Sequence, residues 1–344
     1  MNRKESLCMK NIFGLSDESI VYVLCPANNK TGGTELLHQL VYQLNKIGRE
    51  AYIVYYFEGE YNKYSPTPTE FCTYISQYKI MSNIIDNEKN LLILPEVCIG
   101  KGKKFKKLKK SIWWLSVDNY KQMRGKIKRL KEYGVKSFLK HILLNDFFDN
   151  KDLCQMEYHL CQSFFAETYL LEQGVERKKI VHLSDYVNDL YLKINSNEQR
   201  ENIVLYNPKK GLEFTKKIIQ SAPNLQFIPI INMTNLQINT LMCKAKVYID
   251  FGNHPGKDRL PREATMSGCC IITNNRGAAR FYKDVSIDDR YKIEDVDSNI
   301  NRIIATIKSC LDNYEIEEKN FSKYRALISN EKEKFIKDVY EIFT

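Results

Sequence analysis

The stretch VYIDFGNHPGKDRLPREATMSGCCIITNNRG, from Val247 to Gly277, decides the fold that we expect for this chain. Val247–Phe251 and Cys269–Thr273 are short apolar runs rich in β-branched residues, which predicts two buried strands. A polar loop and a helix that ends at Gly268 lie between them, with Pro261 in the first helical turn, where proline is tolerated. Strand, loop, helix and strand together predict one right-handed crossover of a parallel sheet.

Cations gather at the start of this helix, where they oppose the helix dipole: Lys257, Arg259 and Arg262. An anionic ligand such as phosphate would resolve the conflict, and ligands of parallel sheets bind beyond the carboxyl ends of the strands. A solvated basic turn is the other interpretation. Local chemistry alone does not decide between them.

A second unit of the same kind is predicted near the N-terminus. Ile20–Leu24 and Ala51–Tyr56 are expected strands, and apolar residues at helical spacing lie between them. Gly32-Gly33 opens that helix and Gly48 ends it. Paired glycines let a ligand approach backbone amides closely, although taken alone they more often mark a tight turn.

The rest of the chain repeats this alternation of strands and helices. Further strands are predicted at Leu91–Leu94, Ile112–Val117, His159–Gln162, Ile180–Leu183, Ile203–Tyr206 and Gln226–Ile231. Helices are predicted at Leu236–Lys244, from Ile300 to Leu311 and at the C-terminus. The pattern indicates an α/β protein with two Rossmann-like domains. Polar residues 195–202 suggest a linker, and we place the domain boundary near residue 190.

Composition bounds the class of protein. The chain has 344 residues, of which 43% are hydrophobic and 27% charged, as in soluble globular proteins. No apolar run reaches the ~18–20 residues of a membrane span, and the N-terminus lacks the core of a secretory signal. Ten cysteines without a Cys-x-x-Cys pair indicate neither a zinc site nor a disulfide framework. We therefore expect a cytoplasmic protein.

The net charge of +10 implies an anionic partner. Lys101–Lys110 is rich in lysine and spaces Phe105 and Leu108 three apart, so a helix there would carry an apolar wedge inside a cationic collar. Such a helix could hold the protein reversibly on anionic lipid at the inner face of the plasma membrane. A solvated lysine-rich helix is the alternative. Nothing typical of a nucleic-acid module accompanies the charge, so we expect no nucleic-acid partner.

Leu260–Ala264 (LPREA), followed by Met266 and Gly268, resembles the donor-site signature of the retaining GT-B glycosyltransferases of group 1 (family 4-like). That signature is a Glu-x7-Glu motif, and Glu263 corresponds to its second glutamate, which in the family binds the nucleotide ribose. The first glutamate is absent, so the motif is degenerate. Its region holds His254, Pro255, Gly256 and Lys257.

Two other elements are similar to the same family. Gly32-Gly33-Thr34-Glu35 resembles its Gly-Gly-x-Glu helix start, which faces the acceptor or a phosphate. Lys209-Lys210-Gly211 resembles its lysine-glycine element, whose lysine binds the donor diphosphate. Leu205 stands where the family has an arginine, and a solvated turn is the other interpretation of the two lysines.

Asp118 follows the strand that ends in WWLSV, so it is expected at the carboxyl edge of the first sheet. The family often places a functional polar residue, commonly histidine, in this region. An aspartate that caps a loop or helix is the alternative, and the same applies to Glu96 after Pro95. Asp295-Val296-Asp297 has the form of a metal-binding motif of another glycosyltransferase fold, but helix capping explains it better here.

The resemblance implies a GT-B fold with an acceptor domain at residues 1–190, a nucleotide-sugar domain at 191–325 and a C-terminal helix at 326–344 that packs back on the first domain. It implies transfer of a sugar from a nucleotide sugar to a glycan or lipid-linked glycan in bacterial surface polysaccharide synthesis, with retention of the anomeric configuration and without a metal or cofactor.

Asp118 and Glu263 are the catalytic candidates. The donor-binding candidates are Lys209, Lys210, Gly256, Lys257, Arg259, Leu260 and Glu263, and the acceptor candidates are Gly32, Gly33 and Glu35. A GT-B scaffold that binds nucleotide or polysaccharide without transfer is the alternative.

Overall fold

The computed structural model describes residues 11–57, 65–125, 130, 134–136, 138–139, 141–143, 146–192 and 199–344. The chain forms two compact units. Unit 1 comprises Met1–Gln162, Ala166–Asp185 and Glu333–Thr344, and unit 2 comprises Ser163–Phe165 and Tyr186–Lys332. Apart from the short segment 163–165, the chain passes from unit 1 to unit 2 after residue 185 and returns after residue 332, whereas the sequence analysis placed boundaries after 190 and 325. Residues 195–198 of the expected linker lie outside the described residues.

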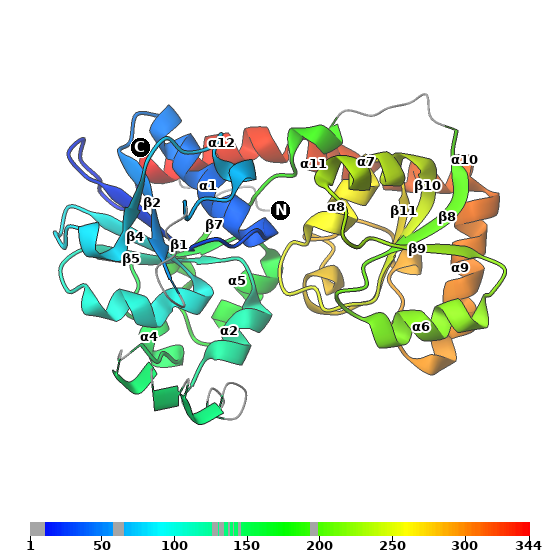
Figure 1. Ribbon diagram of the computed structural model, residues 1–344, viewed down its shortest axis with the longest axis horizontal. Helices are drawn as coiled ribbons and strands as arrows, with labels where there is room; N and C mark the ends of the chain where they lie inside the picture. The colour runs from blue at the N-terminus through cyan, green and yellow to red at the C-terminus, as the bar shows by residue number, and fades with distance from the viewer. Residues whose placement is uncertain are drawn as a thin grey trace, which may run out of the picture. The chain divides into compact units, whose positions relative to one another are not determined.

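Unit 1 is built on a seven-stranded parallel sheet in the order β3-β2-β1-β4-β5-β6-β7 (Figure 1). The strands are β1 (Val21–Pro26), β2 (Ala51–Tyr56), β3 (Tyr78–Ile80), β4 (Leu91–Pro95), β5 (Lys109–Trp114), β6 (His159–Cys161) and β7 (Ile180–His182). Most are continuous apolar runs because both faces of a parallel sheet are covered. Among these strands β3 was not predicted, because it is a partly exposed edge strand whose sequence, Tyr-Lys-Ile, is not an apolar run.

The α-helices of this half include α1 (Gly32–Lys46), α2 (Val117–Met123), α4 (Asn150–Leu153), α5 (Phe164–Glu172) and α12 (Glu331–Phe343). A capping box fixes the start of α1: the Thr31 hydroxyl accepts from the Thr34 N–H, and the Thr34 hydroxyl accepts from the Thr31 N–H. The apolar stripe of α12 packs into unit 1, where the Phe335 ring stacks on Trp113 at 6.5 Å.

The lysine run does not form the predicted amphipathic helix. A 3₁₀ helix, η3 (Glu96–Lys104), ends before Phe105, and β5 begins at Lys109. Phe105 and Leu108 are buried in a core cluster on the sheet, so the prediction of an exposed apolar wedge is wrong. Asp86 fixes this turn, because its carboxylate accepts hydrogen bonds from three successive backbone N–H groups, those of residues 106–108, at 2.8 to 3.0 Å.

Much of the charge in the run is used within unit 1. Lys103 Nζ lies 2.8 Å from an Asp152 carboxylate oxygen, and Lys101 Nζ lies 4.5 Å from the ring centroid of Tyr56. Three lysines of the run have exposed side chains: Lys104, Lys106 and Lys107. Among the described residues, no helix is both long and apolar enough to cross a lipid bilayer.

Unit 2 contains a four-stranded sheet in the order β11-β10-β8-β9, also with parallel pairs throughout. Its strands are β8 (Glu201–Tyr206), β9 (Gln226–Pro229), β10 (Ala245–Asp250) and β11 (Cys270–Thr273). Its α-helices are α6 (Leu212–Ser221), α7 (Asn235–Lys244), α8 (Arg259–Met266), α9 (Ile300–Asp312), α10 (Tyr314–Glu317) and α11 (Ser322–Ser329). Helices α7 and α8 pack together on one face of the sheet, and α6 packs with α9 on the other (Figure 1).

Both units therefore have the doubly wound arrangement that the alternating sequence pattern predicted. The quoted stretch from Val247 to Gly277 forms the crossover β10-α8-β11, with Pro261 in the first turn of α8. The fold class, α/β with two Rossmann-like domains and a C-terminal helix that returns to unit 1, is confirmed.

Candidate functional site

The strand order of unit 2 marks a ligand-binding edge. Strand β8 has β9 on one side and β10 on the other. The chain therefore turns to one side of β8 to form β9 and then crosses to the opposite side of β8 to form β10. Loops that follow β8 and β10 diverge at such a switch point and leave a crevice beyond the carboxyl ends of the strands. Those loops are residues 207–211 and 251–258. The residues predicted from the sequence to bind the donor lie in these loops or on α8.

The two loops meet backbone to backbone at a pair of glycines. Gly211 has a φ of +66°, and a Cβ added to it would lie 2.4 Å from the carbonyl oxygen of Phe251. A Cβ on Gly252 would lie 2.5 Å from Cγ of Lys210. Position 211 therefore requires glycine both for its backbone conformation and for lack of space. Position 252 requires glycine for lack of space alone.

Lys210 lies in an ion-pair network instead of extending into solvent. Its Nζ lies 2.5 Å from Asp258 Oδ2 and 3.5 Å from Asp250 Oδ2, and it donates to the Asn253 carbonyl at 3.0 Å. Burial alone would lower the pKa of Lys210, but the charges of Asp258 and Asp250 outweigh burial and raise it. Lys209, the preceding residue, is exposed, and its backbone N–H donates to the side chain of Asn207.

A buried histidine completes this cluster. His254 Nδ1 lies 2.8 Å from Asp258 Oδ2, and the ring is only 1% exposed. Burial opposes ionisation of Asp258, but the His254 hydrogen bond and the Lys210 charge outweigh it and lower the pKa of Asp258. Asp250, His254 and Asp258 offer ligand atoms within 4.8 Å of one another, close enough to ligate a metal ion. The Lys210 ammonium already contacts both carboxylates of this set.

Glu331 supplies an anion to the basic start of α8. Its two carboxylate oxygens each lie 2.6 Å from a cation, one from Lys257 Nζ and the other from Arg262 Nη1. Arg262 is fully buried and also donates to the carbonyls of Asp258 and Lys257. The conflict between these cations and the helix dipole is thus relieved in part by a carboxylate of the protein itself.

The remaining predicted donor residues lie on or beside α8. Arg259 is its first residue and is partly exposed, whereas Glu263 is 8% exposed. Being four residues apart, these two side chains share one face of the helix. Leu260 packs against the core of unit 2, and Gly256 is buried in the loop before the helix.

A third loop, which follows β11, supports the loop that follows β10. The Asn274 side-chain amide donates to the Gly252 carbonyl at 2.7 Å, and the Ala278 N–H donates to the His254 carbonyl at 2.8 Å. Gly277 allows this approach, because a Cβ on it would lie 2.0 Å from the same His254 oxygen. The edge of unit 2 is therefore a fixed, charge-rich structure.

The Asp-x-Asp pair does not cap α9 as predicted. Asp297 forms a salt bridge with Lys217, whose Nζ lies 2.7 Å from Asp297 Oδ1, and Asp295 pairs with Arg276. The residue at the N-cap position of α9 is Asn299, and it makes no side-chain capping hydrogen bond.

Unit 1 has its own switch point, between β1 and β4, and the predicted acceptor residues of α1 lie there. Gly32 and Gly33 form the first turn of α1 beyond β1. A Cβ on Gly33 would lie 3.6 Å from the Leu115 side chain, an ordinary contact, so packing does not demand glycine at this position. Glu35 is buried and accepts a hydrogen bond from the Tyr74 hydroxyl at 2.9 Å.

Glu96 begins η3 directly after β4, at the same edge. It is 2% exposed, and its Oε2 accepts from the Leu115 N–H at 3.0 Å. Burial raises the pKa of Glu96 to about 7, although hydrogen bonds from backbone N–H groups act in the opposite direction. Asp118 lies in the first turn of α2, partly exposed, while the Ser116 hydroxyl caps that helix. Asp118 thus stands beyond β5, as its position in the sequence indicated.

Sequence reasoning missed several members of the unit 2 cluster. Asp250, His254 and Asp258 did not appear as candidates, although a charged residue at a strand end and a histidine four residues before an aspartate were visible signals. Glu331 gave no signal, because it lies 69 residues from Arg262 in the sequence.

No protein-family model matches the sequence, and no curated protein matches it significantly. Several solved structures do resemble this chain in fold. The chain superposes on Anabaena Alr3699/HepE in complex with UDP and glucose with a TM-score of 0.60 and 11% identity, over 94% of this chain and 97% of that one. The pneumococcal O-GlcNAc transferase GtfA in complex with UDP and GlcNAc gives 0.59 and 9%, over 94% and 99%.

S. aureus TarM, in a structure with fondaparinux, alpha-GlcNAc-glycerol and UDP, gives a TM-score of 0.55 and 13% identity, over 77% of this chain. The chain spans 57% of the length of TarM. At such low identities these similarities establish the fold alone. The protein therefore has the two-domain GT-B fold that these glycosyltransferases share.

Proposed function

We propose that this protein is a glycosyltransferase that takes a sugar from a nucleotide sugar. The observation that carries the proposal is the arrangement at the edge of unit 2. A lysine-glycine turn and the start of α8 meet there at the switch point of a GT-B sheet, where nucleotides bind in this fold class. The similar structures that contain UDP favour a uridine nucleotide as the donor.

In this proposal the diphosphate binds beside the Gly211 turn. Lys209 is exposed and free to approach it, and Lys210 would exchange its longer contact, that with Asp250, for a phosphate oxygen. Arg259 lies at the start of α8, and Glu263 on the same face would bind the ribose. Lys209, Lys210, Arg259 and the start of α8 stabilise the negative charge that develops on the leaving nucleotide diphosphate. We further propose that transfer retains the anomeric configuration and needs no metal.

Residues of unit 1 are assigned to the acceptor. Gly32 and Gly33 leave backbone N–H groups accessible at the start of α1, and Asp118 would orient or deprotonate the acceptor hydroxyl. The acceptor we propose is a glycan or lipid-linked glycan of a bacterial surface polysaccharide. The exposed lysines 104, 106 and 107 could hold the enzyme on anionic lipid at the cytoplasmic face, by charge alone.

A panel of nucleotide sugars tests the donor site directly. A bound donor raises the apparent melting temperature by mass action, so one member should stabilise the protein more than the rest. That donor should also be hydrolysed slowly without an acceptor. Absence of both stabilisation and hydrolysis across the panel would refute the proposal.

Two sets of variants test the assigned residues. Glu263→Ala should lose most donor affinity and turnover while the protein stays folded, because the ribose contact is removed. Lys209→Glu combined with Lys210→Glu should weaken binding of a nucleoside diphosphate far more than binding of the nucleoside. Equal loss for both ligands would place the two lysines outside the diphosphate site.

A non-catalytic GT-B scaffold is the second candidate, and specific observations favour it. Pro255 stands in the region where the motif has its first glutamate, and Lys257 is engaged by Glu331. A protein of this kind would be stabilised by a nucleotide but would not hydrolyse the donor sugar. Hydrolysis measured on the purified protein decides between the two.

A further inference from the structure

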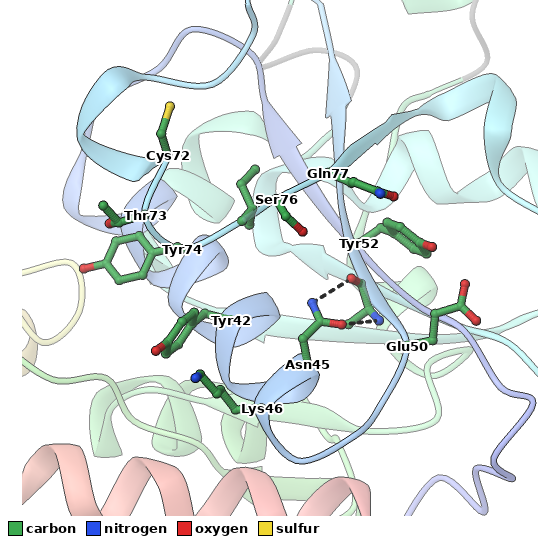
Figure 2. Close-up of a pocket in the computed structure, with 12 residues that line it drawn as sticks. Tyr42, Asn45, Lys46, Glu50, Tyr52, Cys72, Thr73, Tyr74, Ser76 and Gln77 are labelled. Atoms are coloured by element: carbon green, nitrogen blue, oxygen red, sulfur yellow. Dashed lines mark hydrogen bonds between the residues drawn. The ribbon is translucent and has the colours of Figure 1, made fainter.

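An open groove lies on unit 1 at the opposite end of α1 from its glycines. It has a volume of about 620 Å³, within the range of small-molecule sites, and is lined by the last turns of α1, the start of β2 and the residues before β3 (Figure 2). Because α1 runs antiparallel to the strands, its last turns lie at the amino edge of the sheet. The groove is therefore separate from both strand-end sites described above.

Tyrosine rings form the two sides of the groove. Figure 2 shows Tyr42 and Tyr74 on one side and Tyr52 with Gln77 on the other. The rings of Tyr42 and Tyr74 meet edge to face, with their centroids 6.1 Å apart. Aromatic faces carry partial negative charge and attract the weakly positive C–H bonds of a sugar ring, which makes tyrosine suited to binding carbohydrate.

The polar groups of the groove suit an uncharged ligand rich in hydroxyl groups. Thr73, Ser76 and Gln77 are exposed and offer both donors and acceptors. The charged lining residues, Lys46 and Glu50, have opposite signs, and Lys79 Nζ lies 4.1 Å from the ring centroid of Tyr52, so the groove lacks the cluster of cations that a phosphate or a nucleic acid would need.

One lining residue, Tyr74, links the groove to the predicted acceptor residues of α1. The Tyr74 ring lines it, while the Tyr74 hydroxyl donates to Glu35 in the first turn of α1. Lys46, at the far end of the groove, lies roughly 16 Å along the helix from Glu35, at 1.5 Å per residue. A ligand that occupied the groove and also reached the start of α1 would have to be an extended chain.

We propose that the groove binds a neutral oligosaccharide, as a part of the acceptor glycan remote from the hydroxyl that reacts. The identification of the oligosaccharide as part of the acceptor rests on the proposed function. Binding of the oligosaccharide to the groove does not depend on sugar transfer. It adds an accessory binding site to unit 1.

Two cysteines allow a test without any mutation. Cys72 lines the groove, and Cys154 is elsewhere on unit 1; within the part of the chain that the structure describes, these are the cysteines with exposed side chains. Maleimide labelling of each would be followed by mass spectrometry of peptides, with maltotetraose, cellotetraose, chitotetraose or a sulfated heparin tetrasaccharide present at millimolar concentration. At least one neutral tetrasaccharide should slow labelling of Cys72 several-fold and leave Cys154 unchanged.

The variant Tyr42→Ala should abolish that protection, because it removes one ring from the side wall. Tyr340→Ala, which removes an exposed tyrosine of α12, is the matched control and should retain it. Protection by the sulfated sugar alone, equal protection of both cysteines, or none with any neutral tetrasaccharide would overturn the proposal. Donor hydrolysis is measured separately, so a failure here is distinguishable from a failure of the proposed function.

Discussion

The carboxyl edges of the two sheets have the same topology and opposite chemistry. In unit 2, Lys210, Asp250 and Asp258 form a partly buried cluster of charges next to the pair formed by Arg262 and Glu331. In unit 1, the corresponding edge is held by hydroxyl caps, backbone hydrogen bonds and two buried carboxyl groups, those of Glu35 and Glu96. A charged edge suits a diphosphate and a nearly neutral edge suits a sugar hydroxyl, so the difference agrees with the proposed division into donor and acceptor units.

The largest effect should come from removing the carboxylate that two cations of unit 2 share. Glu331→Ala takes that carboxylate away from the fully buried Arg262 and from Lys257, and breaking a buried ion pair costs about 3–5 kcal/mol. Lys334→Ala is the control on the same helix, since its pair with Asp338 is more exposed and worth less than about 1 kcal/mol. Urea unfolding of both variants measures the contrast. A similar loss in the two would mean that the buried pairs of Glu331 contribute no more to stability than an exposed pair does.

The glycine contact between the two loops of unit 2 comes next. Gly211→Ala forces a left-handed residue to carry a Cβ against the Phe251 carbonyl, and we expect a loss of about 3 kcal/mol together with weaker nucleotide binding. Gly174→Ala is matched in conformation, with a φ of +81°, but a Cβ there would meet nothing within 4 Å. It should cost only about 1 kcal/mol. Equal losses would show that conformation alone sets the requirement at Gly211.

The buried carboxyl group of Glu96 should make the stability of unit 1 depend on pH. The folded protein keeps the Glu96 proton up to a pKa of about 7, whereas the unfolded chain loses it near 4.5, so this residue lowers stability as pH rises through that window. Glu96→Gln cannot ionise and should be more stable than the native protein above pH 7, by on the order of 2–3 kcal/mol. The control is Glu88→Gln at an exposed carboxylate. Parallel pH profiles for Glu96→Gln and the native protein would disprove the burial argument.

The smallest effect on stability concerns the exposed lysines of unit 1. Changing Lys104, Lys106 and Lys107 to glutamate should alter unfolding by no more than about 0.5 kcal/mol, because exposed side chains contribute little. The same change should abolish salt-sensitive co-sedimentation with anionic liposomes, if the membrane proposal holds. The control reverses three exposed lysines of unit 2, Lys216, Lys244 and Lys308. Binding that survives the first change but not the second would place the membrane contact on the other unit.

The periodic parts of the fold were predictable from sequence, and the short or non-local parts were not. Apolar runs such as Val247–Phe251 become β10 because a buried parallel strand needs only a local pattern. The prediction of a helix at Lys101–Lys110 was wrong because the spacing of Phe105 and Leu108 resembles that of a helical pair, whereas tertiary packing buries both residues on the sheet. No local pattern predicts that Asp86, some twenty residues earlier, accepts hydrogen bonds from the backbone of that turn.

The candidate site shows the same division. Lys210, Gly211 and Glu263 were recognisable from their neighbours in sequence, since each belongs to a short motif. The partners of those residues were not recognisable. Asp258 lies 48 residues from Lys210, and Glu331 lies 69 from Arg262, so their pairing depends on how the loops and helices of unit 2 are brought together.

The turn held by Asp86 has a consequence for the exchange of backbone hydrogens. Burial would raise the pKa of Asp86, but hydrogen bonds from the N–H groups of Lys106, Leu108 and Lys107 outweigh burial and lower it. The contribution of Asp86 to stability is therefore present above its ordinary pKa and lost as pH falls through the lowered value. Acid should consequently open this turn before the sheet, and those three amides should lose protection against deuterium while the amides of β4 and β5 keep theirs. The lysine-rich segment would then be a local unit whose order depends on one carboxylate.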